Sequence, residues 1–215
     1  MRKITTGIAA LVGLLSLSPS LAFANDTTGN PADPFARDPE AIQTMIDEAN
    51  AKPILPDKAS ATNPGTAQPL AGFGSYPRRP GVILVTPDKY KKIIPTGHAA
   101  IIWSKKSVVE ALAEGVVKRP NNWNNGDRNQ VYGVTVRGTT AAQDNAASNW
   151  AYAQIGKPYN YYNTSTRSKF YCSQLVWAAF KDLYNIDLDT WRFGRAIHPM
   201  ELVWTDRTHV IYRKV

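Results

Sequence analysis

The sequence predicts an α+β fold in which an antiparallel sheet packs against helices. Two runs of strand length, residues 82–86 and 97–103, are apolar at most positions, as expected for strands that are buried on both faces. The apolar residues after Cys172 recur at the spacing of an amphipathic helix: Leu175, Val176, Ala179, Phe180 and Leu183. We therefore expect one main domain, with Cys172 in the first turn of a helix that packs beside the sheet.

Further strands are predicted from similar short runs. Residues 115–117 and 131–137 have strand patterns, and residues 209–212 form a closing strand. Residues 107–112 are ambiguous, because they also fit a short helix with Glu110 and Glu114 on one face. We favour a strand there, and together these segments predict a mostly antiparallel sheet.

Helix signals occur on both sides of these strands. Thr140 and Gln143 form a capping box, and the helix that they start is expected to reach residue 155, where Gly156 ends it. An earlier helix begins after Asp38, which is followed by a proline and an acidic residue at the first helical positions. A short helical piece is also expected at residues 200–203.

Residues 1–24 have the features of an export signal. Arg2 and Lys3 precede an apolar run at residues 8–17, and small residues up to Ala24 fit a cleavage site directly after it. The apolar run is too short to span a bilayer. We therefore expect a protein that is secreted, or periplasmic or otherwise in the cell envelope, without a transmembrane segment.

Composition divides the rest of the chain into an arm and a domain. Residues 25–80 contain nine of the fifteen prolines, so we expect residues 25–79 to be a proline-rich N-terminal arm with one short helix. The predicted regular structure starts after Pro80. The main domain is therefore expected at residues 80–215.

Charge and residue types exclude several functions. Without Arg2 and Lys3 the chain has 23 basic and 17 acidic side chains, a net charge of +6. Such a charge fits binding to anionic envelope polymers or lipid headgroups, and it fits equally well a surface that is charged only to keep the protein soluble. The basic residues are scattered, and no nucleic-acid-binding motif accompanies them. Three histidines and one cysteine show no metal-ligand spacing, and no phosphate or dinucleotide motif indicates a cofactor.

Cys172 is the candidate nucleophile. It is the only cysteine, so it forms no disulfide within the chain, and the positive end of a helix dipole stabilises a thiolate. The alternative is a small buried residue that packs the helix. The surrounding residues favour the nucleophile.

A thiol nucleophile needs a base and a third group that orients the base. His98 follows a glycine in a buried strand, on the same side as Ala100, whereas His198 and His209 fit surface positions. Glu110 comes twelve residues after His98, about the distance for the chain to leave one strand and return along its neighbour. We expect His98 as the base and Glu110 as its orienting group, against the alternatives of a core histidine bound to a carbonyl and an exposed glutamate.

Four stretches together resemble the circularly permuted branch of the NlpC-type cysteine hydrolases, papain-fold proteins of the YiiX and YycO kind: residues 97–101, 109–116, 156–159 and 170–176. In ordinary papain-like enzymes the cysteine precedes the histidine, and here the histidine comes first. The resemblance implies a permuted papain-like fold and a catalytic set of Cys172, His98 and Glu110 that hydrolyses an amide bond through a thioester. Val82 and Gln174 depart from the family, whose members often have acidic residues at these positions.

These observations predict an exported cysteine hydrolase, an amidase or peptidase that acts on cell-wall peptides. Tyr159 and Tyr171 are the candidate substrate-binding residues, and the backbone amide of Cys172 with a second donor, such as a tyrosine hydroxyl, would stabilise the oxyanion. Two alternatives stay open. One is a lipid amide or ester hydrolase or acyltransferase that uses the same Cys–His pair, and the other is a non-catalytic module that binds cell wall.

Overall fold

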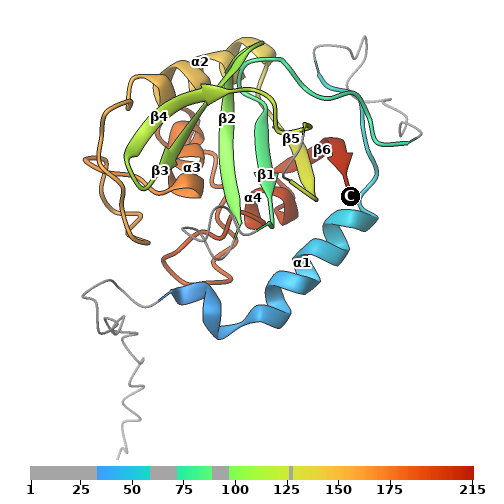
Figure 1. The fold of residues 1–215 in the computed structure, drawn as a ribbon, viewed down its shortest axis with the longest axis horizontal. Helices are drawn as coiled ribbons and strands as arrows, with labels where there is room; N and C mark the ends of the chain where they lie inside the picture. Colours follow the sequence, from blue (N-terminus) through green and yellow to red (C-terminus); the bar gives the residue numbers. More distant parts are fainter. Residues whose placement is uncertain (1–32, 59–71, 89–96, 126–127) are drawn as a thin grey trace, which may run out of the picture.

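The centre of the molecule is a six-stranded antiparallel sheet with the strand order β4-β3-β2-β1-β5-β6 (Figure 1). The computed structural model describes residues 33–58, 72–88, 97–125 and 128–215. The strands are β1 (Ile83–Thr86), β2 (His98–Ser104), β3 (Ser107–Leu112), β4 (Gly115–Pro120), β5 (Val131–Val136) and β6 (Thr208–Lys214).

Helices cover one face of this sheet. They are the short 3-10 helix η1 (Pro34–Arg37) and the α-helices α1 (Pro39–Ala51), α2 (Ala141–Tyr152), α3 (Cys172–Tyr184) and α4 (Glu201–Trp204). α2 and α3 pack on β2 and β3, α4 packs on β5 and β6, and α1 packs on α4 (Figure 1). Within the described ranges, no helix has the length and apolar character needed to cross a membrane.

The architecture confirms the predicted α+β fold and settles the ambiguous segment. Residues 107–112 form β3, which pairs with its neighbours on both sides. α2 starts at the predicted capping box but ends at Tyr152, earlier than expected, because the amides of Gln154 and Ile155 donate to carbonyls three residues back, those of Ala151 and Tyr152, at 3.0 and 3.1 Å. The predicted export signal and its cleavage site lie outside the described residues.

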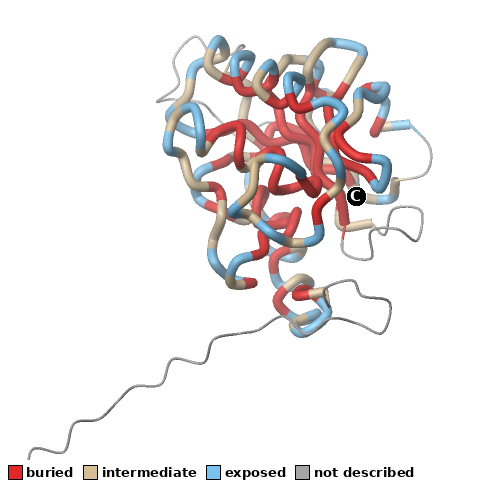
Figure 2. The backbone as a smooth tube through the Cα atoms, turned by 90° about the vertical axis from the view of Figure 1, so that its left-hand side faces the viewer, coloured by how far each residue is buried: buried red, intermediate tan, exposed pale blue. Residues whose placement is uncertain are grey.

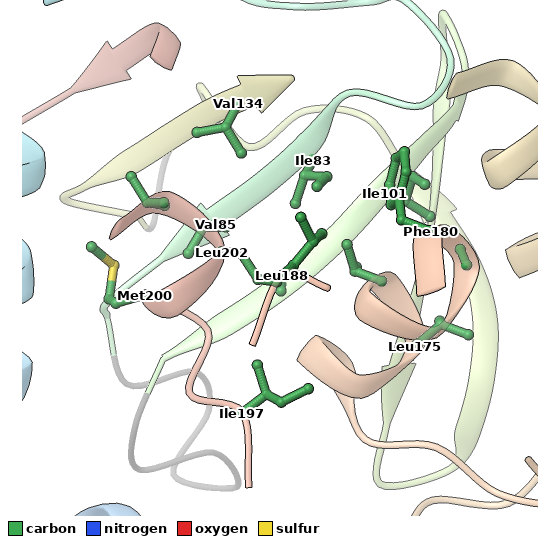
Figure 3. Packing of buried hydrophobic residues seen from close by; sticks show 14 of the residues in the cluster. Ile83, Val85, Ile101, Val134, Leu175, Phe180, Leu188, Ile197, Met200 and Leu202 are labelled. Carbon is green, nitrogen blue, oxygen red and sulfur yellow. The ribbon is translucent and has the colours of Figure 1, made fainter. Parts of the chain in front are cut away.

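The sheet has an apolar cluster on each face. The larger cluster lies between the strands and the helices, and Figure 3 shows part of it: Ile83, Val85, Ile101, Val134, Leu175, Phe180 and Leu202. The smaller cluster is built on alternate strand residues that point the other way, such as Leu84 and Ala100, together with Trp123. Buried residues are concentrated in the middle of the molecule as a result (Figure 2).

The described parts of the proline-rich arm pack against the domain. Asp38 caps α1 as expected, accepting from the Ala41 amide at 2.9 Å, and apolar residues of α1 belong to the larger cluster. The arm then follows the outer edge of β6. There the Leu55 amide donates to the Val210 carbonyl at 2.8 Å, and the Arg213 amide donates to the Phe73 carbonyl at 2.9 Å.

A buried ionic network joins the arm to α2. The Asp144 carboxylate is fully buried and lies 3.0 Å from the Lys58 ammonium and 2.8 Å from the Arg79 guanidinium. It also accepts hydrogen bonds from the hydroxyls of Thr135 and Thr139, at 3.1 and 2.6 Å. Asp144 therefore pairs with two largely buried cations, of which Arg79 also pairs with the Asp57 carboxylate at 2.8 Å.

We expect Asp144→Asn to destabilise the fold by about 3 kcal/mol, because it removes the buried counter-charge of Lys58 and one of the two carboxylates that pair with Arg79. Urea unfolding measures the difference. The matched control is Asp182→Asn, whose ion pair with Arg167 is about one-third exposed and should contribute less than about 1 kcal/mol. Similar unfolding midpoints for the two variants would contradict a structural role of Asp144.

Candidate active site

Hydrogen bonds around the start of α3 hold Cys172 in place. The Ser173 hydroxyl donates to the Ile197 carbonyl at 2.6 Å, which ties the first turn to the loop before α4. The Gln174 side chain accepts from the Tyr171 amide at 3.2 Å and donates to the Thr166 carbonyl at 2.9 Å. Gln174, which departs from the family pattern, therefore connects the helix start to the preceding loop.

His98 and Glu110 meet on neighbouring strands, as the twelve-residue spacing predicts. His98 begins β2, Glu110 lies in β3, and the His98 Nε2 is 2.5 Å from a Glu110 carboxylate oxygen. Both side chains are buried. The His98 ring also stacks on Trp123, with ring centres 5.5 Å apart, and the Arg128 guanidinium lies over the Trp123 ring. These contacts fix the plane of the imidazole.

Gly97 allows the chain to enter β2 at this point. Its φ is +94°, and a Cβ there would lie 2.5 Å from the Thr86 carbonyl oxygen of β1. A side chain would therefore push β2 away from β1. The glycine before His98 is required by the backbone.

Cys172 and His98 lie close enough for each to shift the pKa of the other. Because Glu110 occupies Nε2, Nδ1 is the ring nitrogen that is left to serve the thiol. Cys172 is 3% exposed, so the sulfur is largely shielded from water. The structure thus brings together the three residues that the sequence singled out, Cys172, His98 and Glu110. Their catalytic roles stay a prediction.

His98 and Cys172 belong to elements on different sides of the sheet. His98 has the same side-chain direction in β2 as Ala100, which belongs to the smaller cluster, whereas α3 packs on the opposite face. The backbone amides of Ala99 and Ser173 help to lower the pKa of the Cys172 thiol, so the start of β2 and the start of α3 both contribute to the site.

The surroundings of the pair favour the charged forms of both groups. Burial by itself raises the pKa of Cys172, but the His98 hydrogen bond and charge, with the amides of Ala99 and Ser173, bring it below its usual value. Burial lowers the pKa of His98, whereas hydrogen bonds with Cys172 and Glu110 raise it, and the balance is a rise from 6.5 to about 9. An activated cysteine nucleophile requires this combination.

The two predicted substrate-binding tyrosines have different surroundings. Tyr159 is half-buried beside Tyr161, and burial and the charge of Cys172 raise its pKa. Tyr171 is buried, and its hydroxyl accepts from the Ile197 amide at 2.9 Å, which supports the loop behind α3. Substrate binding by either residue stays a prediction.

His198 is not at the surface, which corrects the expectation from the sequence. It is fully buried, its ring packs on Phe35 at 4.9 Å between centres, and its Nδ1 accepts from the Met200 amide at 3.1 Å. The proline after it suggested an exposed loop, but the loop is covered by η1. His209 is half-buried.

Two residues near the site were not identified from the sequence. Trp123 stacks on His98, and Phe35 of η1 packs edge-on against Tyr162 in the loop between α2 and α3. Both come from segments without a periodic pattern, so no local signal indicates them. The described residues contain no group of three or more His, Cys, Asp or Glu side chains that could hold a metal ion.

Comparison with known proteins identifies the family. The model of the permuted papain-like amidases, the YaeF/YiiX or C92 family, matches residues 85–210, a range that contains Cys172, His98 and Glu110. The chain belongs to this family. Membership confirms the predicted resemblance and the permuted papain-like fold.

Two relatives agree with this assignment. The Bacillus subtilis (strain 168) protein YycO, described as uncharacterized, is 26% identical over 130 residues, which cover 58% of this chain and 52% of YycO. The chain thus spans about half the length of this curated relative. The crystal structure of YiiX from Escherichia coli O157:H7, described as a metalloprotein, aligns with a TM-score of 0.50 at 15% identity, over 63% of this chain and 97% of YiiX. It shows a shared fold.

Proposed function

We propose that the protein is an exported cysteine-dependent amidase or peptidase that cleaves an amide bond in cell-wall peptides. The observation that carries the proposal is the Cys172 thiol held against an imidazole whose other nitrogen is 2.5 Å from the Glu110 carboxylate. This is the arrangement of a thiol nucleophile, a base and an orienting group. Membership of a family of papain-like amidases supports amide hydrolysis.

The reaction follows from the proton positions. The Cys172 thiolate attacks the substrate carbonyl carbon, and the backbone amide of Cys172 at the start of α3 would stabilise the oxyanion. His98 gives its Nδ1 proton to the leaving amine, the C–N bond breaks, and a thioester forms. His98 then takes a proton from water, which attacks the thioester; the C–S bond breaks, the acid is released, and the Cys172 thiolate and the His98 imidazolium are restored. Glu110 keeps the imidazole oriented throughout.

The cell-wall substrate is supported by the sequence. The export signal at residues 1–24 would deliver the protein to the envelope, and the net charge of +6 without Arg2 and Lys3 favours binding to anionic wall polymers. The burial of Cys172, His98 and Glu110 together weighs against a purely non-catalytic wall-binding module. Burying ionisable groups costs free energy, and clusters of such groups with shifted pKa values are concentrated at functional sites.

Incubating the mature protein with purified cell wall and with lipid amides and esters tests the proposal. We expect new amine and carboxyl ends in wall peptides, and an acid-quenched protein whose mass is increased by a peptidyl group on Cys172. A fatty acyl group on Cys172 would overturn the peptide substrate in favour of a lipid hydrolase or acyltransferase. Wall binding without product or adduct would indicate the non-catalytic module.

A further inference from the structure

A groove outside the candidate active site runs beside α1 and α4. Its volume is about 570 Å³, and it is formed by the second half of α1, the end of α4 and the loop between α3 and α4. Of the described residues that line it, Trp191 and Trp204 are the two with large apolar surfaces, and the other eight are polar or charged. The lining therefore combines two flat indole rings with a rim of hydrogen-bonding groups.

Trp191 presents its indole at the groove from a well-anchored loop. The residue is 65% exposed, although burying an indole is favourable. On one side of it, the Thr190 amide donates to the buried Glu201 carboxylate at 3.1 Å. On the other side, the Arg192 guanidinium pairs at 2.6 Å with Asp38, the residue that caps α1. The backbone that positions this exposed ring is therefore fixed before any ligand binds.

Trp204 is also fixed, and it joins the groove to a second hollow. Its indole N–H donates to the Glu48 carboxylate at 2.5 Å, which orients the ring against α1. The second hollow has a volume of about 380 Å³ and is lined by Trp204 and by residues of the first half of α1. Together the two hollows follow α1, whose 13 residues span roughly 20 Å. This surface is long enough for a chain of several units.

The charges of the larger groove favour an uncharged ligand. Four carboxylates and two cations line it: Glu48, Asp187, Asp189, Asp206, Lys52 and Arg207. An excess of carboxylates repels a polyanion. Asp187 already pairs with Lys181 at 3.1 Å, and the Lys52 ammonium donates to the Trp204 carbonyl at 2.6 Å. Burial raises the pKa of Asp189 to about 7, so this group carries only part of its charge at neutral pH.

A sugar has the chemistry that matches this lining. Its ring has a face of C–H groups that can stack on an indole, and its hydroxyls donate to carboxylates and accept from ammonium or guanidinium groups. An acyl chain or an apolar helix would need aliphatic surface, which the described lining of the larger groove does not offer. We propose that the groove binds a neutral glycan strand, with Trp191 and Trp204 stacking on its sugar rings.

This inference goes beyond the proposed function and does not depend on it. None of the residues that line the two hollows belongs to the candidate catalytic set of Cys172, His98 and Glu110. Glycan binding therefore requires no thiol chemistry. If the protein hydrolyses nothing but binds glycan, the proposed function fails and this inference stands.

Calorimetric titration with two neutral oligosaccharides, the N-acetylglucosamine tetramer and the glucose tetramer cellotetraose, tests the inference. We expect at least one of them to bind, and Trp191→Ala to weaken that binding at least about tenfold, as for an aromatic residue that dominates an interface. Trp191→Tyr keeps an aromatic face and should lose less. Phe73→Ala is the matched control, because Phe73 is 59% exposed and is not among the residues that line either hollow. It should bind as the wild type does.

Thermal unfolding checks that the variants are folded, and because Trp191 is largely exposed, its replacement should leave the unfolding temperature nearly unchanged. Equal binding by the wild type and Trp191→Ala, or no binding of either neutral tetramer, would overturn the inference. Binding of the cationic glucosamine tetramer alone would also overturn it, in favour of a site for organic ammonium groups.

Discussion

Replacing Cys172 by alanine is expected to lower the rate of amide hydrolysis by roughly 10⁴-fold or more, because the nucleophile is removed and the thioester cannot form. The fold should persist. The change removes one sulfur atom from the start of α3, while the hydrogen bonds of Ser173 and Gln174 that hold this turn remain, so the loss of stability should be about 1 kcal/mol. Product release measured by mass, together with thermal unfolding, checks both statements.

Cys172→Ser is the control for the size of the side chain at this position. It keeps a hydroxyl of similar size next to His98, but the alcohol does not ionise near neutral pH, so activity should also be lost. Hydrolysis by Cys172→Ala within tenfold of the wild-type rate would exclude the thiol as nucleophile. The family assignment and the fold would remain unaffected by that outcome.

His98 is expected to control the pH dependence of Cys172 reactivity. The thiolate is lost as the pH falls through the lowered pKa of Cys172, and the imidazolium is lost as the pH rises through about 9. The thiolate and the imidazolium are therefore present together at pH values between these two pKa values. A free thiol with a pKa of about 8.5 is only roughly 0.3% ionised at pH 6, so its alkylation slows on the order of 200-fold between pH 9 and pH 6.

Alkylation by iodoacetamide measures this profile, and the label is unambiguous because the chain has one cysteine. For the folded wild type we expect a drop between pH 9 and pH 6 that is at least several-fold smaller than that of a free thiol, whereas His98→Asn should restore a drop on the order of 100-fold. The ratio of rates removes the effect of limited access to the buried sulfur. His209→Asn is the control and should behave as the wild type. A steep wild-type profile, or a flat one in His98→Asn, would contradict the ion pair.

Local patterns were sufficient to predict the central part of the site. The apolar stripe after Cys172 indicates a helix start, and the two runs around His98 and Glu110 indicate adjacent strands joined by a short turn. Each of these signals depends on neighbours within about twelve residues. His98 and Glu110 lie close together because two antiparallel strands joined by a short turn bring the chain back alongside itself.

The surroundings of the site could not be predicted in the same way. Trp123 stacks on His98 from a loop, and Phe35 reaches Tyr162 across more than a hundred residues of chain. Strand alternation indicates which face a side chain occupies but not what covers that face. The same reason explains why His198 was expected at the surface, since η1, which covers it, has no repeating apolar pattern in the sequence.

The arm along β6 has a consequence for how the protein behaves at high concentration. An uncovered edge strand is a template for pairing with another molecule and hence a starting point for aggregates. Because Leu55 and Phe73 already use backbone groups of β6, that template is occupied within the same chain. A segment whose composition suggests a spacer thus shields the last strand, and the solubility of the whole protein is expected to depend on it.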